Sequence, residues 1–194
     1  MKKILILATA LMFNNGAMGA VFGTDMGTSL SSLNKQLKLK AESQYLYSTS
    51  TLPKGHPDFD NYWLLVTSKH GLCKVTAYID RVNTNVYGEE LILKFGNLET
   101  ALSSKYGNGK KFDYLRAGSI WNERRDWMMG LLKKDRTLVT YWTKNELELP
   151  ADIAAISLQA DARGSDMGSI TLSYEFNNSS ECVEWIKQQK NSNL

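Results

Sequence analysis

YWLLVTSKHGLCKVTAYID, residues 62–80, is the stretch of this sequence that decides the fold. Its first six residues are aromatic, aliphatic or β-branched, as strands prefer. The next four, which end at Gly71, are typical of a turn. From residue 73 onward the chain alternates and places every second side chain on one face, namely Cys73, Val75, Ala77 and Ile79. The stretch therefore predicts a β-hairpin.

Working outward, we expect a short helix after Thr28, where leucines at 30, 33 and 37 share a face, and an extended segment at 41–48. Residues 90–95 fit either a helix or a strand, and the alternation of their apolar residues favours a strand. A helix is then expected from Asn97 to Tyr106, with Gly107 as its stop. A strand at 137–142 and a helix at 178–190 are expected in the second half.

The second half echoes the first when the register is shifted by about 81 residues. Asp80 then falls on Asp161 and Asn97 on Asn178, while the apolar positions of 91–95 fall on those of 172–176. This pattern indicates two packed βββα repeats, at about 28–108 and 109–190. Chance agreement between two amphipathic hairpins is the alternative. Either way the predicted class is α+β, with antiparallel meander sheets covered on one face by helices.

The first twenty residues are typical of a secretory signal peptide. Lys2 and Lys3 precede an apolar run from Ile4 to Phe13, and a small-residue exit follows at 16–20. A buried N-terminal helix is the alternative. The apolar run is about half the ~20 residues that a membrane-spanning helix needs. We therefore expect residues 1–20 to be removed, leaving 21–194 as a single periplasmic or secreted α+β domain without a transmembrane span.

Removal of the signal peptide also changes the charge. Lys2 and Lys3 supply two of the three net positive charges, so the mature chain would carry +1. A near-neutral chain lacks the basic surface that binds nucleic acid. The two cysteines, Cys73 and Cys182, both survive processing, and an even count in an oxidising compartment favours one disulfide. Two separate buried thiols are the alternative.

The motifs of enzymes and metal proteins are weak or missing in the sequence. His56 and His70 lack partners at ligand spacing, so no metal is expected. There is no Gly-x-Ser-x-Gly elbow, and the glycines after Tyr106 follow a helix instead of opening one, so no phosphate-binding cofactor loop is expected. The acids available to a hydrolase lie mostly in loops, at Asp58, Asp60, Glu89, Glu90, Asp161 and Asp166.

Residues 119–130 form an unusual cluster of tryptophan, arginine and methionine. Tryptophan and arginine dominate binding hot spots, and methionine provides an adaptable apolar surface. This composition predicts a partner-binding patch made of Trp121, Arg124, Arg125, Trp127 and Met128. In the alternative interpretation the two tryptophans are core residues covered by the arginines.

The exported leader, the segments Phe22-Gly23 and Met26–Leu30, and the meander followed by a helix resemble small periplasmic proteins of uncharacterised function from Gram-negative bacteria. The layout is also similar to that of tandem-repeat β-lactamase inhibitory proteins. That resemblance implies a concave sheet that grips an enzyme, and it transfers no functional residue.

Taken together, these features predict a non-enzymatic binding protein of the periplasm, an inhibitor or immunity-type partner of another protein. It would use no cofactor and would bind no nucleic acid. An envelope hydrolase that uses loop carboxylates is one alternative. An envelope-assembly or structural protein is another.

Overall fold

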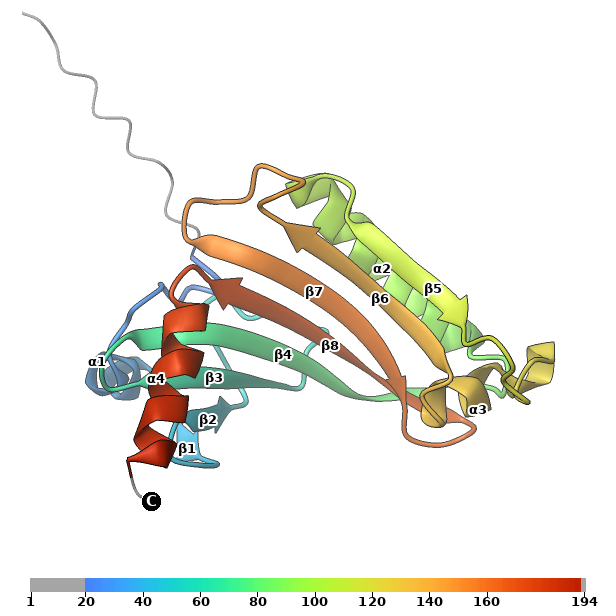
Figure 1. Ribbon diagram of the computed structural model, residues 1–194, viewed down its shortest axis with the longest axis horizontal. Helices are drawn as coiled ribbons and strands as arrows, with labels where there is room; N and C mark the ends of the chain where they lie inside the picture. The colour runs from blue at the N-terminus through green and yellow to red at the C-terminus, as the bar shows by residue number, and fades with distance from the viewer. Residues whose placement is uncertain (1–19, 193–194) are drawn as a thin grey trace, which may run out of the picture.

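The computed structural model describes residues 20–192, and in it a single antiparallel sheet of eight strands forms the centre of the protein (Figure 1). The strands are β1 (Lys40–Ala41), β2 (Leu46–Thr49), β3 (Asn61–Thr67), β4 (Gly71–Asn83), β5 (Lys110–Leu115), β6 (Arg136–Thr143), β7 (Ile153–Ala162) and β8 (Met167–Phe176). The helices are α1 (Leu30–Gln36), α2 (Glu89–Tyr106), α3 (Trp127–Leu132) and α4 (Ser179–Asn191), and a 3-10 turn, η1 (Arg124–Asp126), precedes α3. The signal peptide expected at 1–20 lies outside the described residues except for Ala20.

The predicted hairpin is confirmed as β3 and β4. Leu64 pairs with Val75 and Trp63 with Thr76, and a bulge follows Leu65. The turn ends at Gly71, whose φ is +64°. A Cβ on Gly71 would lie 2.1 Å from the carbonyl oxygen of Gly27, so the N-terminal segment can pass here only because this residue is glycine.

The sheet consists of two four-strand meanders. Strands β1 to β4 run in sequence order to the centre, where β4 pairs with β8, and β8 to β5 continue to the other edge. The central pair is antiparallel, with Val75 opposite Tyr174 and Ala77 opposite Leu172. The predicted α+β class with an antiparallel meander is therefore confirmed.

The strand predicted at 90–95 is wrong, because these residues form the first two turns of α2. Leu91 and Phe95 are buried, whereas Leu93 between them is 65% exposed. The burial thus follows the helical spacing of three to four residues, and it continues through Leu98 and Leu102. Asn97 lies inside this helix and does not cap it. The shift of 81 residues therefore places helix on strand, and the predicted βββα repeats are not found in that register.

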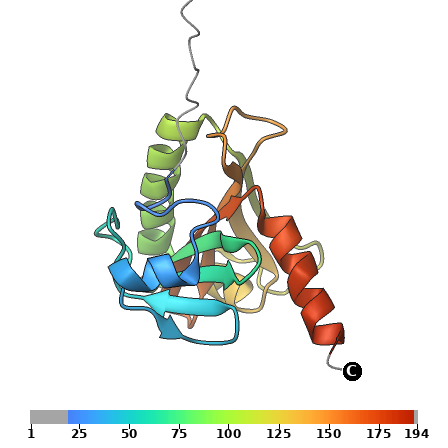
Figure 2. The same ribbon diagram turned by 90° about the vertical axis from the view of Figure 1, so that its left-hand side faces the viewer.

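The two long helices do not cover one face together, contrary to the prediction. The side of α2 that faces the sheet carries five buried residues, Leu91, Phe95, Leu98, Leu102 and Tyr106. They join the hydrophobic core with the inward side chains of β3, β4, β7 and β8. By contrast, α4 buries only Cys182. Figure 2 shows α4 on the side of the strands away from α2.

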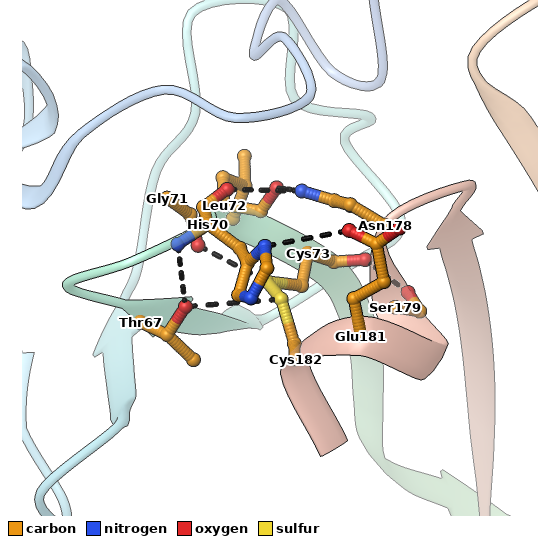
Figure 3. The surroundings of a disulfide bond; sticks show 9 residues. All are labelled: Thr67, His70, Gly71, Leu72, Cys73, Asn178, Ser179, Glu181 and Cys182. Atoms are coloured by element: carbon orange, nitrogen blue, oxygen red, sulfur yellow. Dashed lines mark hydrogen bonds and ion pairs between the residues drawn. A yellow bond between two sulfur atoms is a disulfide. The ribbon is translucent and has the colours of Figure 1, made fainter. Parts of the chain in front are cut away.

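A disulfide between Cys73 and Cys182 joins α4 to β4, which confirms the predicted pair (Figure 3). The Cα atoms of the two cysteines are 6.5 Å apart, and both residues are buried. The side-chain amide of Asn178 donates hydrogen bonds to the carbonyl oxygens of His70 (3.0 Å) and Leu72 (3.1 Å). These contacts hold the start of α4 against the β3–β4 turn. None of the helices in the described residues is long and apolar enough to cross a membrane.

Candidate binding surfaces

The side of the sheet that points away from α2 forms a broad surface, which we call the open face. Strand alternation and register bring one row of side chains together across five strands, Trp63, Thr76, Ser173, Ser157 and Tyr141. The adjacent row is formed by Tyr78, Thr171, Gln159, Val139 and Phe112. In Figure 1, β6, β7 and β8 lie in front of α2, so this surface faces the viewer, and α4 lies over its β3–β4 end.

The open face has aromatic margins and a floor of small hydroxyl side chains. Trp63 and Tyr78 pack edge to face at one margin, with ring centroids 5.9 Å apart. Phe112 and Tyr141 do the same at the other margin, at 6.0 Å. Between the margins, the hydroxyls of Thr76 and Ser173 are buried and lie 3.3 Å apart, within hydrogen-bonding distance of each other, whereas Ser157 and Thr171 are half-buried. Tyr141 remains 40% exposed, so a large amphipathic ring is available to a partner.

The charged side chains on this face lie close to opposite charges on the face or in the neighbouring loops. Lys74 contacts the carboxylate of Glu175 at 2.9 Å, and Lys134 pairs with Asp161. Burial, and secondarily the nearby carboxylate of Asp80, raise the pKa of Tyr78 above its usual value of 10.0, so its hydroxyl remains a hydrogen-bond donor even in mildly alkaline solution. The open face therefore presents hydrogen-bonding groups and rings but little net charge.

The size of the open face suits a protein contact. Six strands at about 4.8 Å spacing span roughly 24 Å, and seven residues along a strand span roughly 23 Å. The projected area is therefore on the order of 550 Å² before side-chain relief is included. A standard interface buries about 800 Å² on each partner. Most of such a contact could be accommodated on this face.

The predicted patch at 121–128 lies elsewhere, at the end of the molecule where α3 and the start of α2 meet. Arg124 and Arg125 are exposed, and Trp121 is half-buried. Trp127 packs against Gly88, and the Arg136 guanidinium lies 5.6 Å from its ring centroid. Met128 is fully buried in the core. The prediction is therefore wrong for Met128, because a partner cannot reach a fully buried side chain.

Two residues that the sequence does not single out extend this patch. Ile120 is 77% exposed, the highest value among the large apolar side chains of residues 20–192. Tyr87 lies under the guanidinium of Arg124, at 5.4 Å from the ring centroid. Arg124 also contacts the carboxylate of Glu89 at 3.4 Å. The arginine predicted to contact a partner is therefore already engaged with its own chain.

The candidate acids of a hydrolase are bound to neighbouring groups. Asp58 pairs with Lys94 at 2.8 Å, and Asp60 accepts the backbone N–H of Asp80 at 2.8 Å. A hydrogen bond from Thr84 chiefly lowers the pKa of Glu90, whereas a general acid requires a raised value.

The remaining acids are arranged no more favourably for catalysis. Glu89 pairs with Arg124, and Asp161 pairs with Lys134. The contact of Asp166 is made by its backbone carbonyl, which accepts the N–H of Thr84, and so says nothing of its carboxylate. In the described part of the chain, no group of three or more His, Cys, Asp or Glu side chains is arranged to hold a metal ion.

The fold defines an α+β protein whose antiparallel sheet is covered by α2 and α3 on one side and only in part, by α4, on the other. Comparison with protein families, curated proteins and solved structures finds no match to this chain. The resemblance to periplasmic and β-lactamase inhibitory proteins therefore stays a prediction. The function of the chain has to be inferred from the geometry of the molecule itself.

Proposed function

We propose that this chain is an exported, non-enzymatic binding protein that holds a partner protein on its open face. The observation that carries the proposal is a sheet surface with aromatic margins, a hydroxyl floor and paired charges, which α2 and α3 leave uncovered and which α4 covers only at its β3–β4 end. Aromatic residues are enriched at protein interfaces, and unpaired charges are depleted from their centres. The disulfide supports an oxidising compartment such as the periplasm.

The chemistry of the open face suits a neutral partner surface. The rings of Trp63 and Tyr141 offer apolar area at the two margins, and the half-buried hydroxyls of Ser157 and Thr171 between them can donate or accept hydrogen bonds. A partner that presents apolar side chains around exposed peptide groups would match this arrangement. Such a partner would be held by shape and hydrogen bonds, as in an inhibitor or immunity-type complex.

Site-specific cross-linking tests the proposal. A photoreactive phenylalanine analogue is placed at Tyr141 on the open face, and in a matched variant at Leu93, which is exposed on the outer side of α2. After irradiation in cells of the native host, the Tyr141 variant should yield one discrete adduct with a single protein. The Leu93 variant should yield none.

The purified adduct partner is then mixed with the unmodified mature chain to measure affinity. Trp63→Ala should weaken that affinity at least tenfold, because truncating an aromatic interface anchor costs about 1–3 kcal/mol or more. Equal cross-linking at Leu93, or unchanged affinity in the Trp63 variant, would place the partner elsewhere and refute the proposal.

A further inference from the structure

A second concave site, which we call the α4 cleft, lies at the end of the sheet where α4 is attached. Its volume is about 810 Å³, within the ~300–1,000 Å³ typical of small-molecule sites. It is bounded by the residues before and within α1, the start of β2, the β3–β4 turn and one face of α4. The side chains that give it its chemical character are Gln44, Tyr45, Tyr47, Lys69, Trp185 and Gln189.

Aromatic rings line two sides of the α4 cleft. Tyr45 and Trp185 meet edge to face, with ring centroids 5.4 Å apart. Tyr47 contributes a third ring, whose hydroxyl donates to the carbonyl oxygen of Gln44 at 3.3 Å. All three rings are half-buried, so each keeps a surface open to the cleft.

The disulfide sets the position of the α4 wall. Cys182, Trp185 and Gln189 are spaced at i, i+3 and i+7, and they therefore share one side of the helix. The bond from Cys182 to Cys73 turns that side toward the body of the protein. Nearby, a ring nitrogen of His70 lies 3.4 Å from the Glu181 carboxylate, which adds a contact beside the disulfide (Figure 3).

The polar groups of the cleft are hydroxyls, amides, the imidazole of His70 and one ammonium group. Gln44 and Gln189 bring two amides, and serine and threonine hydroxyls line the turn between β3 and β4. Lys69 is exposed at the rim. Among the described residues that line the α4 cleft there is no Asp or Glu. The cleft is thus aromatic, rich in neutral hydrogen-bonding groups and weakly positive.

We propose that the α4 cleft binds a saccharide chain that carries a carboxylate. Aromatic rings pack against the C–H faces of sugar rings, and side-chain amides pair with sugar hydroxyls as donor and acceptor at once. The Lys69 ammonium would bind the carboxylate. A nucleotide would require several cations for its phosphates, and a lipid tail would require an apolar lining, so neither fits this set of groups.

The test uses the mature, disulfide-bonded chain and two probes. One is the disaccharide of N-acetylglucosamine and N-acetylmuramic acid, which has a carboxylate, and the other is the neutral disaccharide of N-acetylglucosamine. Calorimetry or a tryptophan fluorescence titration should give a several-fold higher affinity for the acidic sugar. Lys69→Met should remove that preference.

Variants on both walls separate binding from folding. Trp185→Ala on α4 and Tyr45→Ala before β2 should each weaken binding of the acidic sugar at least tenfold, while circular dichroism and disulfide content stay unchanged. Trp63→Ala on the open face is the matched control and should bind the sugar as the parent chain does. The same controls separate this site from the partner surface, since Trp185→Ala should leave partner affinity intact.

Three results would overturn the proposal. The first is a failure of the acidic probe to bind at millimolar concentration. The second is unchanged binding in both wall variants, and the third is equal affinity for the two sugars. None of them would bear on the open face.

Discussion

Gly168 sets how closely α2 can approach the central strands. A Cβ at this position would lie 2.4 Å from a methyl carbon of Leu91 and 3.1 Å from the carbonyl oxygen of Asp161. Leu91 is fully buried, so it has little room to move. Gly168→Ala should therefore lower the free energy of unfolding by about 1–3 kcal/mol, the usual effect of overpacking. Urea denaturation of the mature chain measures it.

A double variant shows whether the side chain of Leu91 is the cause. Leu91→Ala alone should cost about 2–5 kcal/mol through the cavity it leaves. Combined with Gly168→Ala it should cost less than the two changes added together, because the shortened side chain makes room for the new methyl group. Strict additivity would mean that the strain arises at the Asp161 backbone instead.

Glu90 should make the start of α2 sensitive to acid. Its carboxylate accepts hydrogen bonds from the Thr84 hydroxyl at 2.7 Å and from the backbone N–H of Asn85 at 3.1 Å. The first of these chiefly lowers its pKa below the usual value of 4.5. Because the folded state holds the charged form, the stabilisation is present above pH 4.5 and is lost as the pH falls through the lowered pKa.

Thermal unfolding at several pH values tests this dependence. Glu90→Gln should unfold at a slightly lower temperature than the parent chain at about pH 7, and the difference should shrink below about pH 4. Glu148→Gln, at an exposed position between β6 and β7, is the control and should follow the parent at every pH. A difference that is constant with pH would mean that the charge of Glu90 is not involved.

At the scale of elements, α4 depends on its disulfide more than on packing. Only Cys182 of this helix is buried, whereas α2 buries five residues. The bond closes a loop with a sequence separation of 109 residues, for which the chain-entropy model gives at most about 4–5 kcal/mol. The variant Cys73→Ser/Cys182→Ser should therefore be less stable by up to that amount.

Hydrogen exchange locates the effect of losing the disulfide. Backbone amides of α4 should exchange much faster in the double serine variant under native conditions, because local opening of this helix is no longer limited by the covalent link to β4. Those of α2 should change only as far as global stability does. The affinity for the acidic sugar should also fall in this variant, because α4 forms one wall of the α4 cleft. Equal protection of both helices would show that packing alone holds α4.

The elements that can be predicted from the sequence are those whose pattern is local and unambiguous. The hairpin of β3 and β4 alternates cleanly, and Asn178 and Gly107 mark helix ends where expected. The start of α2 is predicted wrongly because its apolar residues at 91, 93 and 95 alternate over too short a window. The edge strand β5 gives little signal because it has no fully buried residue.

The candidate sites depend on how distant elements pack together, which the hydrophobic pattern of the sequence does not show. Met128 is buried only because α3 turns inward against the start of α2. The open face has a local signal, since Trp63, Thr76 and Tyr78 alternate with buried residues in the same hairpin. Its aromatic margin on β5 and β6 is joined to that hairpin by the pairing of β4 with β8, which links distant parts of the chain.

At the scale of the whole molecule, the sheet has two different sides. One side is sealed by α2 and α3 over a hydrophobic core. The other is covered by α4 at one end, and its remaining area carries side chains that can contact solvent or a partner. Antiparallel sheets tolerate this arrangement, since one face packs on a core while the other stays solvated. The open face therefore needs no partner for folding. Substitutions on this face should lower the affinity for a partner without lowering the stability of the fold.

The two aromatic margins of the open face should contribute independently to partner binding. Trp63 and Tyr141 stand four strand spacings or roughly 19 Å apart. If one partner spans the face, Trp63→Ala and Tyr141→Ala should each reduce its affinity about 10- to 100-fold, and their effects should add because the sites share no contact. Calorimetry with the partner protein that cross-linking identifies measures the affinity of each variant. Leu93→Ala, on the far side of the molecule, should leave the affinity unchanged. If one of the two open-face variants binds the partner as tightly as the parent chain does, the partner contacts only the other margin.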